Sequence, residues 1–84
     1  MEVIQIRPLT ERETEILNLL AKFKENSEIA RELNVSESTV KAHIMSILNK
    51  LGTYSRSQAV IVALKNGLIK LDDIQVKKRG QTIL

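Results

Sequence analysis

The chain has 84 residues, a net charge of +3 at neutral pH and no cysteine. This length corresponds to a single domain, and the lack of cysteine excludes a disulfide framework and a thiolate metal site. No apolar run approaches the roughly 20 residues of a membrane-spanning helix, and nothing resembles a secretory signal. We therefore expect a cytoplasmic protein that makes no contact with a membrane.

The charges are distributed unevenly along the chain. Residues 10–37 contain seven acids and four bases, whereas residues 38–71 contain five bases and no acid. This asymmetry favours a cationic surface that binds an anionic partner. The alternative is a solvated helix surface that lacks acids without any functional reason.

The first predicted helix begins after Thr10. Thr10 followed three residues later by Glu13 is the pattern of a capping box, in which each side chain bonds the other residue's backbone N–H. At 100° per residue, one apolar arc faces a core and consists of Ile16, Leu17, Leu19, Leu20 and Phe23.

A short helix over residues 27–33 and a longer one from Glu37 to about Leu51 follow. Asn26 is the expected N-cap of the short helix, and residues 34–36 (Asn-Val-Ser) form the break between the two helices. Gly52 provides the C-terminal stop. The longer helix has a narrow apolar stripe, made of Val40, Ile44, Ile47, Leu48 and Leu51.

A fourth helix is predicted from Ser55 to Asn66, closed by Gly67. Ser55 and Gln58 have the spacing of a second capping box. One side of this helix covers the core through Ala59, Val60, Ala63 and Leu64. The opposite side presents two apolar residues and predicts a dimer interface formed by Gln58, Ile61, Val62 and Lys65. The alternative is that the C-terminal tail covers this side through Ile69, Leu71, Ile74 or Val76.

Two short helices joined by a tight turn, of which the second is longer, are the layout of a helix-turn-helix. The second helix must project from the body, so that small and polar side chains can approach base edges in a major groove about 12 Å wide. The helix from Glu37 to about Leu51 meets this demand. Its outer side carries Ser38, Thr39, Lys41, Ala42, His43, Met45, Ser46, Asn49 and Lys50. An ordinary helical hairpin inside a bundle would show a similar pattern.

Several separate motifs resemble the LuxR/GerE type of helix-turn-helix domain. They are LTERE at residues 9–13, EIAREL at 28–33, VSESTVKAH at 35–43, KLG at 50–52 and SRSQAV at 55–60. The resemblance implies an all-α, four-helix, dimerising module of bacterial transcription regulators that binds double-stranded DNA. Such modules occur at the C-terminus of response regulators and quorum-sensing receptors, and as lone short proteins. RNA polymerase is a further partner that the resemblance suggests.

The resemblance also assigns roles to individual positions. Lys41, Ala42 and Met45 match places from which the family contacts base edges. Thr39, His43 and Lys50 match places near the DNA backbone, and Arg56 matches an arginine that is typical of the start of the fourth helix. From the residue chemistry, polar readout of bases rests largely on Lys41, Ser38, Ser46 and Asn49.

The chain departs from the family's pattern between the first two helices. Phe23 stands where the family usually has glycine, so we expect no left-handed residue there and a first helix that continues further or ends differently. Ser27 stands where the family usually has lysine, which removes one expected phosphate contact, and Lys24 could restore a charge nearby.

The sequence offers no catalytic constellation. His43 is the only histidine, and without cysteine or a second histidine it has no partners for a metal site. We expect no enzyme activity, no cofactor and no small-molecule ligand in this chain. A protein-interaction module is the main alternative to DNA binding.

The predicted organisation is an N-terminal segment (1–8), the DNA-binding domain (9–69) and a C-terminal tail (70–84). The tail is expected either to pair with Val3–Ile6 or to reach DNA through its basic run, Lys77 to Arg79.

Overall fold

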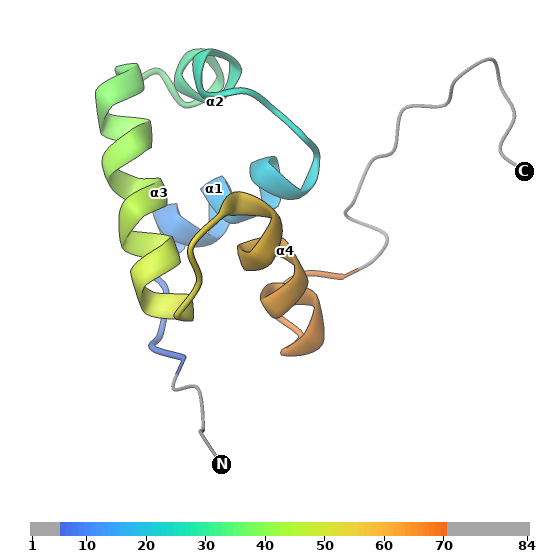
Figure 1. Ribbon diagram of the computed structural model, residues 1–84. Helices are drawn as coiled ribbons and strands as arrows, with labels where there is room; N and C mark the ends of the chain where they lie inside the picture. The colour runs from blue at the N-terminus through green and yellow to red at the C-terminus, as the bar shows by residue number, and fades with distance from the viewer. Residues whose placement is uncertain (1–5, 71–84) are drawn as a thin grey trace, which may run out of the picture.

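The computed structural model describes residues 6–70, and four helices account for most of them (Figure 1). They are α1 (Glu11–Ala21), α2 (Asn26–Leu33), α3 (Glu37–Leu51) and α4 (Arg56–Lys65). The longest, α3, runs along one edge of the molecule and contacts α1, α2 and α4, and α1 also packs against α4. Within the described residues there is no strand, so the predicted all-α, four-helix fold is confirmed.

The core forms where the apolar stripes of the four helices meet. Ile16, Leu17, Ile29, Ile47 and Leu51 have no exposed surface. Each such aliphatic side chain contributes roughly 1.5–3 kcal/mol by leaving water. Buried alanines on α4, Ala59 and Ala63, provide small side chains where this helix meets the core.

The first helix begins as the sequence predicts. The Thr10 hydroxyl accepts a hydrogen bond from the Glu13 N–H at 3.1 Å, and the Glu13 carboxylate accepts one from the Thr10 N–H at 2.9 Å. This capping box satisfies backbone donors that have no partner inside the helix.

Two other predicted caps are wrong in detail. Glu25, rather than Asn26, is the N-cap of α2, because the Glu28 carboxylate accepts the Glu25 N–H at 2.8 Å and so places the cap one residue earlier. At α4 the Ser55 hydroxyl does cap the Gln58 N–H, but the Gln58 side chain accepts from the Tyr54 N–H at 2.7 Å instead of from Ser55.

All four helices end in the same way, with a left-handed residue just past the last turn. At each end the next N–H reaches back five residues to a helix carbonyl, as the bonds from Lys24 to Leu19 and from Val35 to Ala30 show. The left-handed residues are Phe23, Asn34, Gly52 and Gly67, with φ of 62°, 59°, 68° and 72°. Asparagine and glycine adopt this conformation readily.

Phe23 therefore contradicts two predictions. It is left-handed although no left-handed residue was expected there, and its side chain is 67% exposed although it was placed in the apolar arc that faces the core. The physical reason is the early end of α1 at Ala21. The Phe23 N–H bonds to the Leu20 carbonyl, which turns the chain sharply before α2 and directs the aromatic ring away from the core.

On α4 the two predicted outward apolar residues differ. Ile61 is 53% exposed, as expected, but Val62 is half-buried and packs against the core, so its expected outward position is wrong. The tail from Leu71 onward lies outside the described residues, and so does its predicted pairing with residues 3–5. Ile6, the last residue of that predicted pairing segment, packs on the core. Within residues 6–70, no helix combines the length and the apolar character that crossing a bilayer requires.

Candidate nucleic-acid interface

The outer side of α3 is a stripe of exposed small, polar and basic residues. Its members recur at helical spacing and are Ser38, Lys41, Ala42, Met45 and Asn49. Met45 is 68% exposed, and no acid interrupts the stripe after Glu37 in the first turn. Because the side chains are short or flexible, this face can approach the floor of a major groove closely.

The shoulder of α3 that carries Ser46 and Lys50 faces α1. Both side chains are half-buried and bind the Glu13 carboxylate. The Ser46 hydroxyl donates to Glu13 Oε2 at 2.6 Å, and Lys50 Nζ lies 2.8 Å from Glu13 Oε1. These contacts tie the middle and the end of α3 to the start of α1. Ser46 and Lys50, which the sequence predicts to contact DNA, thus hold α3 in place within the protein.

Glu13 is the one buried charged residue of the described core and remains ionised. Burial by itself would raise the pKa of Glu13. Hydrogen bonds from Lys50, Ser46 and the Thr10 N–H, together with the Lys50 charge, outweigh burial and lower the pKa from 4.5 to about 2. The Glu13 carboxylate is therefore charged at every physiological pH. The ion pair between Glu13 and Lys50 that fixes α3 thus does not depend on pH in that range.

Hydroxyl groups gather at the N-terminal end of α3. Ser36 caps the helix by accepting from the Thr39 N–H at 3.1 Å, and its hydroxyl lies 3.2 Å from that of Ser38 and 2.9 Å from that of Thr39. The N-terminus of a helix carries partial positive charge. Of the other predicted backbone contacts, Thr39 is exposed and His43 is half-buried.

The opposite end of α3 is held by Arg7, which the sequence interpretation missed. The Arg7 N–H donates to the Lys50 carbonyl at 3.0 Å, and its guanidinium donates to the Asn49 carbonyl at 3.3 Å. The first contact gives a donor to a carbonyl in the last turn of α3, and the second adds to the Gly52 N–H that the Asn49 carbonyl already accepts at 3.3 Å. Only the tertiary fold brings Arg7 to residues about forty positions later, so no local pattern could have revealed it. Whether the domain begins at residue 9, as predicted, stays a prediction.

A profile of the luxR family of bacterial regulatory proteins matches residues 7–63, which span the whole of the helix-turn-helix just described. The chain belongs to this family. LuxR-family modules are DNA-binding transcription regulators rather than enzymes, which agrees with the predicted absence of catalytic activity.

Relatives of this LuxR-family chain include a short protein and much longer ones. The spore germination protein GerE of Bacillus subtilis is 47% identical over 68 residues, which cover 80% of this chain and 92% of GerE. The uncharacterized transcriptional regulatory protein YxjL of the same organism is 46% identical over 63 residues, or 75% of this chain. The chain matches only 29% of the length of YxjL.

Solved structures show the same LuxR-family fold. GerE superposes with a TM-score of 0.72 at 42% identity, over 76% of this chain and 96% of GerE. VqmA of Vibrio cholera, in a complex with ligand and DNA, superposes with a TM-score of 0.70 at 32% identity, over 81% of this chain and 30% of VqmA.

The remaining predicted site residues of this LuxR-family chain lie on α4. Arg56 is exposed and donates to the Asn26 side-chain oxygen, which links the starts of α4 and α2. Gln58, Ile61 and Lys65 are exposed, and their role in a dimer interface stays a prediction. Among residues 6–70, no three His, Asp or Glu side chains gather as they would around a metal ion.

Proposed function

We propose that this chain binds specific sequences in double-stranded DNA by inserting α3 into the major groove, and that it does so as a dimer formed through α4. The observation that carries the proposal is the exposed, acid-free stripe on α3 from Ser38 to Asn49. A helix that was only part of a bundle would have no need of a projecting face free of acids.

In this proposal the residues of the stripe contact bases, and residues on either side of it contact phosphates. Lys41, Ser38 and Asn49 carry polar groups for base edges, while Ala42 and Met45 can contact thymine methyl groups. Thr39, His43 and Lys50 lie on the sides of α3 and Arg56 lies at the start of α4, and phosphate contacts from these residues would anchor the helix. Since Ser46 and Lys50 already bind Glu13, we assign them mainly to orienting α3.

A solved relative supports dimerisation, and the exposed residues of α4 support this helix as the interface. VqmA is described as a dimer that binds target DNA. In this chain Gln58, Ile61 and Lys65 are exposed on one helix. A two-fold dimer would present two copies of α3 to successive major grooves. Contact with RNA polymerase stays a further prediction.

The salt dependence of DNA affinity tests the proposal. If a dimer neutralises about six to eight phosphates, the logarithm of affinity should fall with the logarithm of salt concentration at a slope of about −0.9 per phosphate. Fluorescence anisotropy with fragments selected from a random DNA pool measures this slope. Weak DNA binding that does not change with salt concentration would contradict the proposal. So would a selection in which the bound DNA fragments share no common sequence.

Substitution of Lys41 tests which face reads the bases. Lys41→Ala should lower affinity and also reduce the preference for the selected site over random DNA. Lys22→Ala is the matched control, because it removes the same charge from the end of α1. Equal losses in the two variants would show that α3 does not read the sequence.

A further inference from the structure

Phe23 is an exposed aromatic residue in a backbone conformation that does not suit it. The other left-handed helix ends use Asn34, Gly52 and Gly67, whereas a bulky side chain at positive φ strains the backbone. With 67% of Phe23 exposed, the folded monomer recovers little of this cost by burial. Neither the monomer fold nor DNA contact by α3 gives the ring a role.

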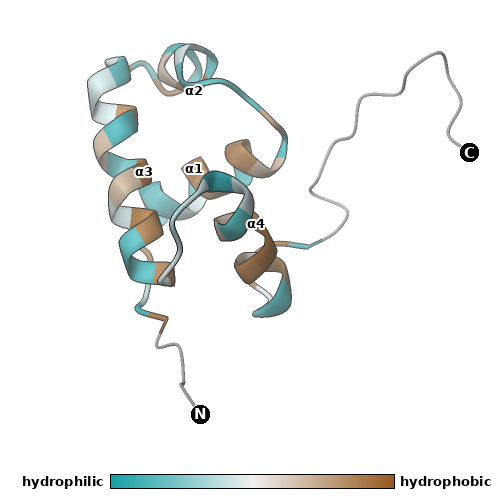
Figure 2. Cartoon of the chain, in the orientation of Figure 1, coloured by the Kyte–Doolittle hydropathy of each residue, from teal (hydrophilic) through white to brown (hydrophobic). Residues whose placement is uncertain are grey.

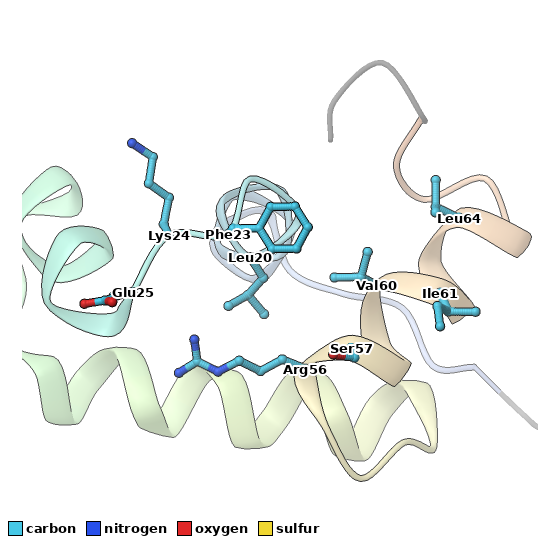
Figure 3. Close-up of a pocket in the computed structure, with 9 residues that line it drawn as sticks. All are labelled: Leu20, Phe23, Lys24, Glu25, Arg56, Ser57, Val60, Ile61 and Leu64. Carbon is cyan, nitrogen blue, oxygen red and sulfur yellow. The ribbon is translucent and has the colours of Figure 1, made fainter. Parts of the chain in front are cut away.

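The ring stands at the edge of an apolar pocket between the end of α1 and α4. The pocket has a volume of about 490 Å³, and Figure 3 shows Leu20 and Phe23 from the α1 side facing Val60 and Leu64 from α4. Lys24, Glu25 and Arg56 lie around the rim. The space is large enough for an aromatic ring and a branched aliphatic side chain together.

The pocket is continuous with the face of α4 that we propose as the dimer interface. Residues 59–64 are six consecutive apolar residues, so at 100° per residue they surround the helix, as the brown stretch of α4 in Figure 2 shows. The core covers Ala59 and Ala63 completely, and Val60, Val62 and Leu64 also pack against it in part. Ile61 lies on the uncovered side and also lines the pocket. Among residues 59–64, Ile61 is therefore the apolar residue that the monomer leaves mostly exposed, at 53%.

We propose that a second copy of this chain fills the pocket, with the Phe23 ring of each copy packed against Leu20, Ile61 and Leu64 of the other. This inference rests on the proposed dimer and enlarges its interface from α4 alone to α4 and the end of α1. A two-fold interface must present the same patch on both copies, so the patch needs both a projecting group and a space to receive it. Phe23 and the pocket supply these two parts side by side. The rim carries both charge signs, Glu25 and Lys24, which favours contact between identical patches over repulsion.

Replacing Phe23 separates this role from a role in folding. Phe23→Gly and Phe23→Asn should each raise the dimer dissociation constant at least tenfold in sedimentation equilibrium. Both should also raise the unfolding temperature measured at a concentration where the protein is monomeric, because glycine and asparagine accept positive φ. Tyr54→Ala is the control. Tyr54 is 92% exposed and does not line the pocket, so the dimer dissociation constant of this variant should equal that of the unchanged protein.

A parallel measurement on Ile61→Lys distinguishes failure of this inference from failure of the dimer. If Ile61→Lys dissociates the dimer and the Phe23 variants do not, the dimer stands and the role of Phe23 is wrong. If the unchanged protein is monomeric at every concentration, both are wrong. Faster proteolysis of residues 71–84 in a monomeric Phe23→Gly protein would instead assign the pocket to that segment. A lower unfolding temperature of the monomeric variants would make Phe23 a structural residue and also overturn the inference.

Discussion

Glu13 connects three parts of the molecule through a single carboxylate. It closes the capping box of α1, accepts from Ser46 in the middle of α3 and pairs with Lys50 near the end of that helix. Removing one partner of a buried charge leaves the other without compensation, which costs more than the pair contributes when intact. The orientation of α3, and with it the position of the stripe that we propose binds DNA, therefore depends on this side chain.

The ion pair predicts a specific dependence of stability on pH. The pKa of Glu13 is about 2 in the folded protein, below its ordinary value of 4.5. The contribution of Glu13 to stability is thus fully present above pH 4.5 and is lost as the pH falls from 4.5 towards 2. Glu13→Gln should lower the free energy of unfolding by about 1–3 kcal/mol at pH 7. Denaturant unfolding of both proteins between pH 7 and pH 2.5 should show this difference shrinking below pH 4.5, and a constant difference would contradict the assignment.

Among the helices, α3 combines two faces with different tasks. The stripe through Lys41 is exposed to solvent, whereas Lys50 on the side of the helix is fixed by Glu13 through its side chain and by Arg7 through its backbone carbonyl. The sequence interpretation placed both lysines on the DNA-binding side. The structure adds that Lys50 has a partner inside the protein.

The two lysines should therefore respond differently to substitution. Lys50→Met keeps the aliphatic stem but removes the charge beside the buried carboxylate, and it should lower the free energy of unfolding by about 2 kcal/mol. Lys41→Met removes an exposed charge and should leave stability within about 0.5 kcal/mol. The unfolding temperatures of the two variants, measured in the absence of DNA, compare their stabilities. Equal unfolding temperatures would show that the Lys50 pair contributes nothing.

Local signals account for what the sequence predicted correctly at this scale. All four helices were predicted from patterns of neighbouring residues. Examples are the capping box of Thr10 and Glu13, the left-handed glycine (Gly52) that ends α3, and the apolar stripes. The end of α1 was predicted wrongly because Phe23 has no local preference for positive φ, and the turn is imposed by the packing of α1 and α2 on α3. The Glu13–Lys50 pair and the Arg7 contacts join distant segments, so periodicity could not reveal them.

At the scale of the whole molecule, a single copy offers DNA one helix of 15 residues and few basic groups. Residues 38–70 carry five lysines and arginines, and only Lys41 lies on the exposed stripe of α3. One such helix makes too few phosphate contacts for tight binding at physiological salt, since affinity grows with the number of phosphates neutralised. In the proposed dimer, pairing two copies would double these contacts and would fix the separation of the two α3 helices.

That fixed separation predicts how affinity depends on the spacing of DNA half-sites. A two-fold dimer places its recognition helices about one helical turn apart, roughly 34 Å or 10 base pairs. Inserting five base pairs between the half-sites turns one of them to the opposite side of the duplex. Affinity measured by anisotropy should then fall at least tenfold, close to that for a single half-site. The Ile61→Lys variant should bind both spacings equally and weakly, because its copies act independently. A natural dimer that binds both spacings equally would show that α4 does not set the geometry of recognition.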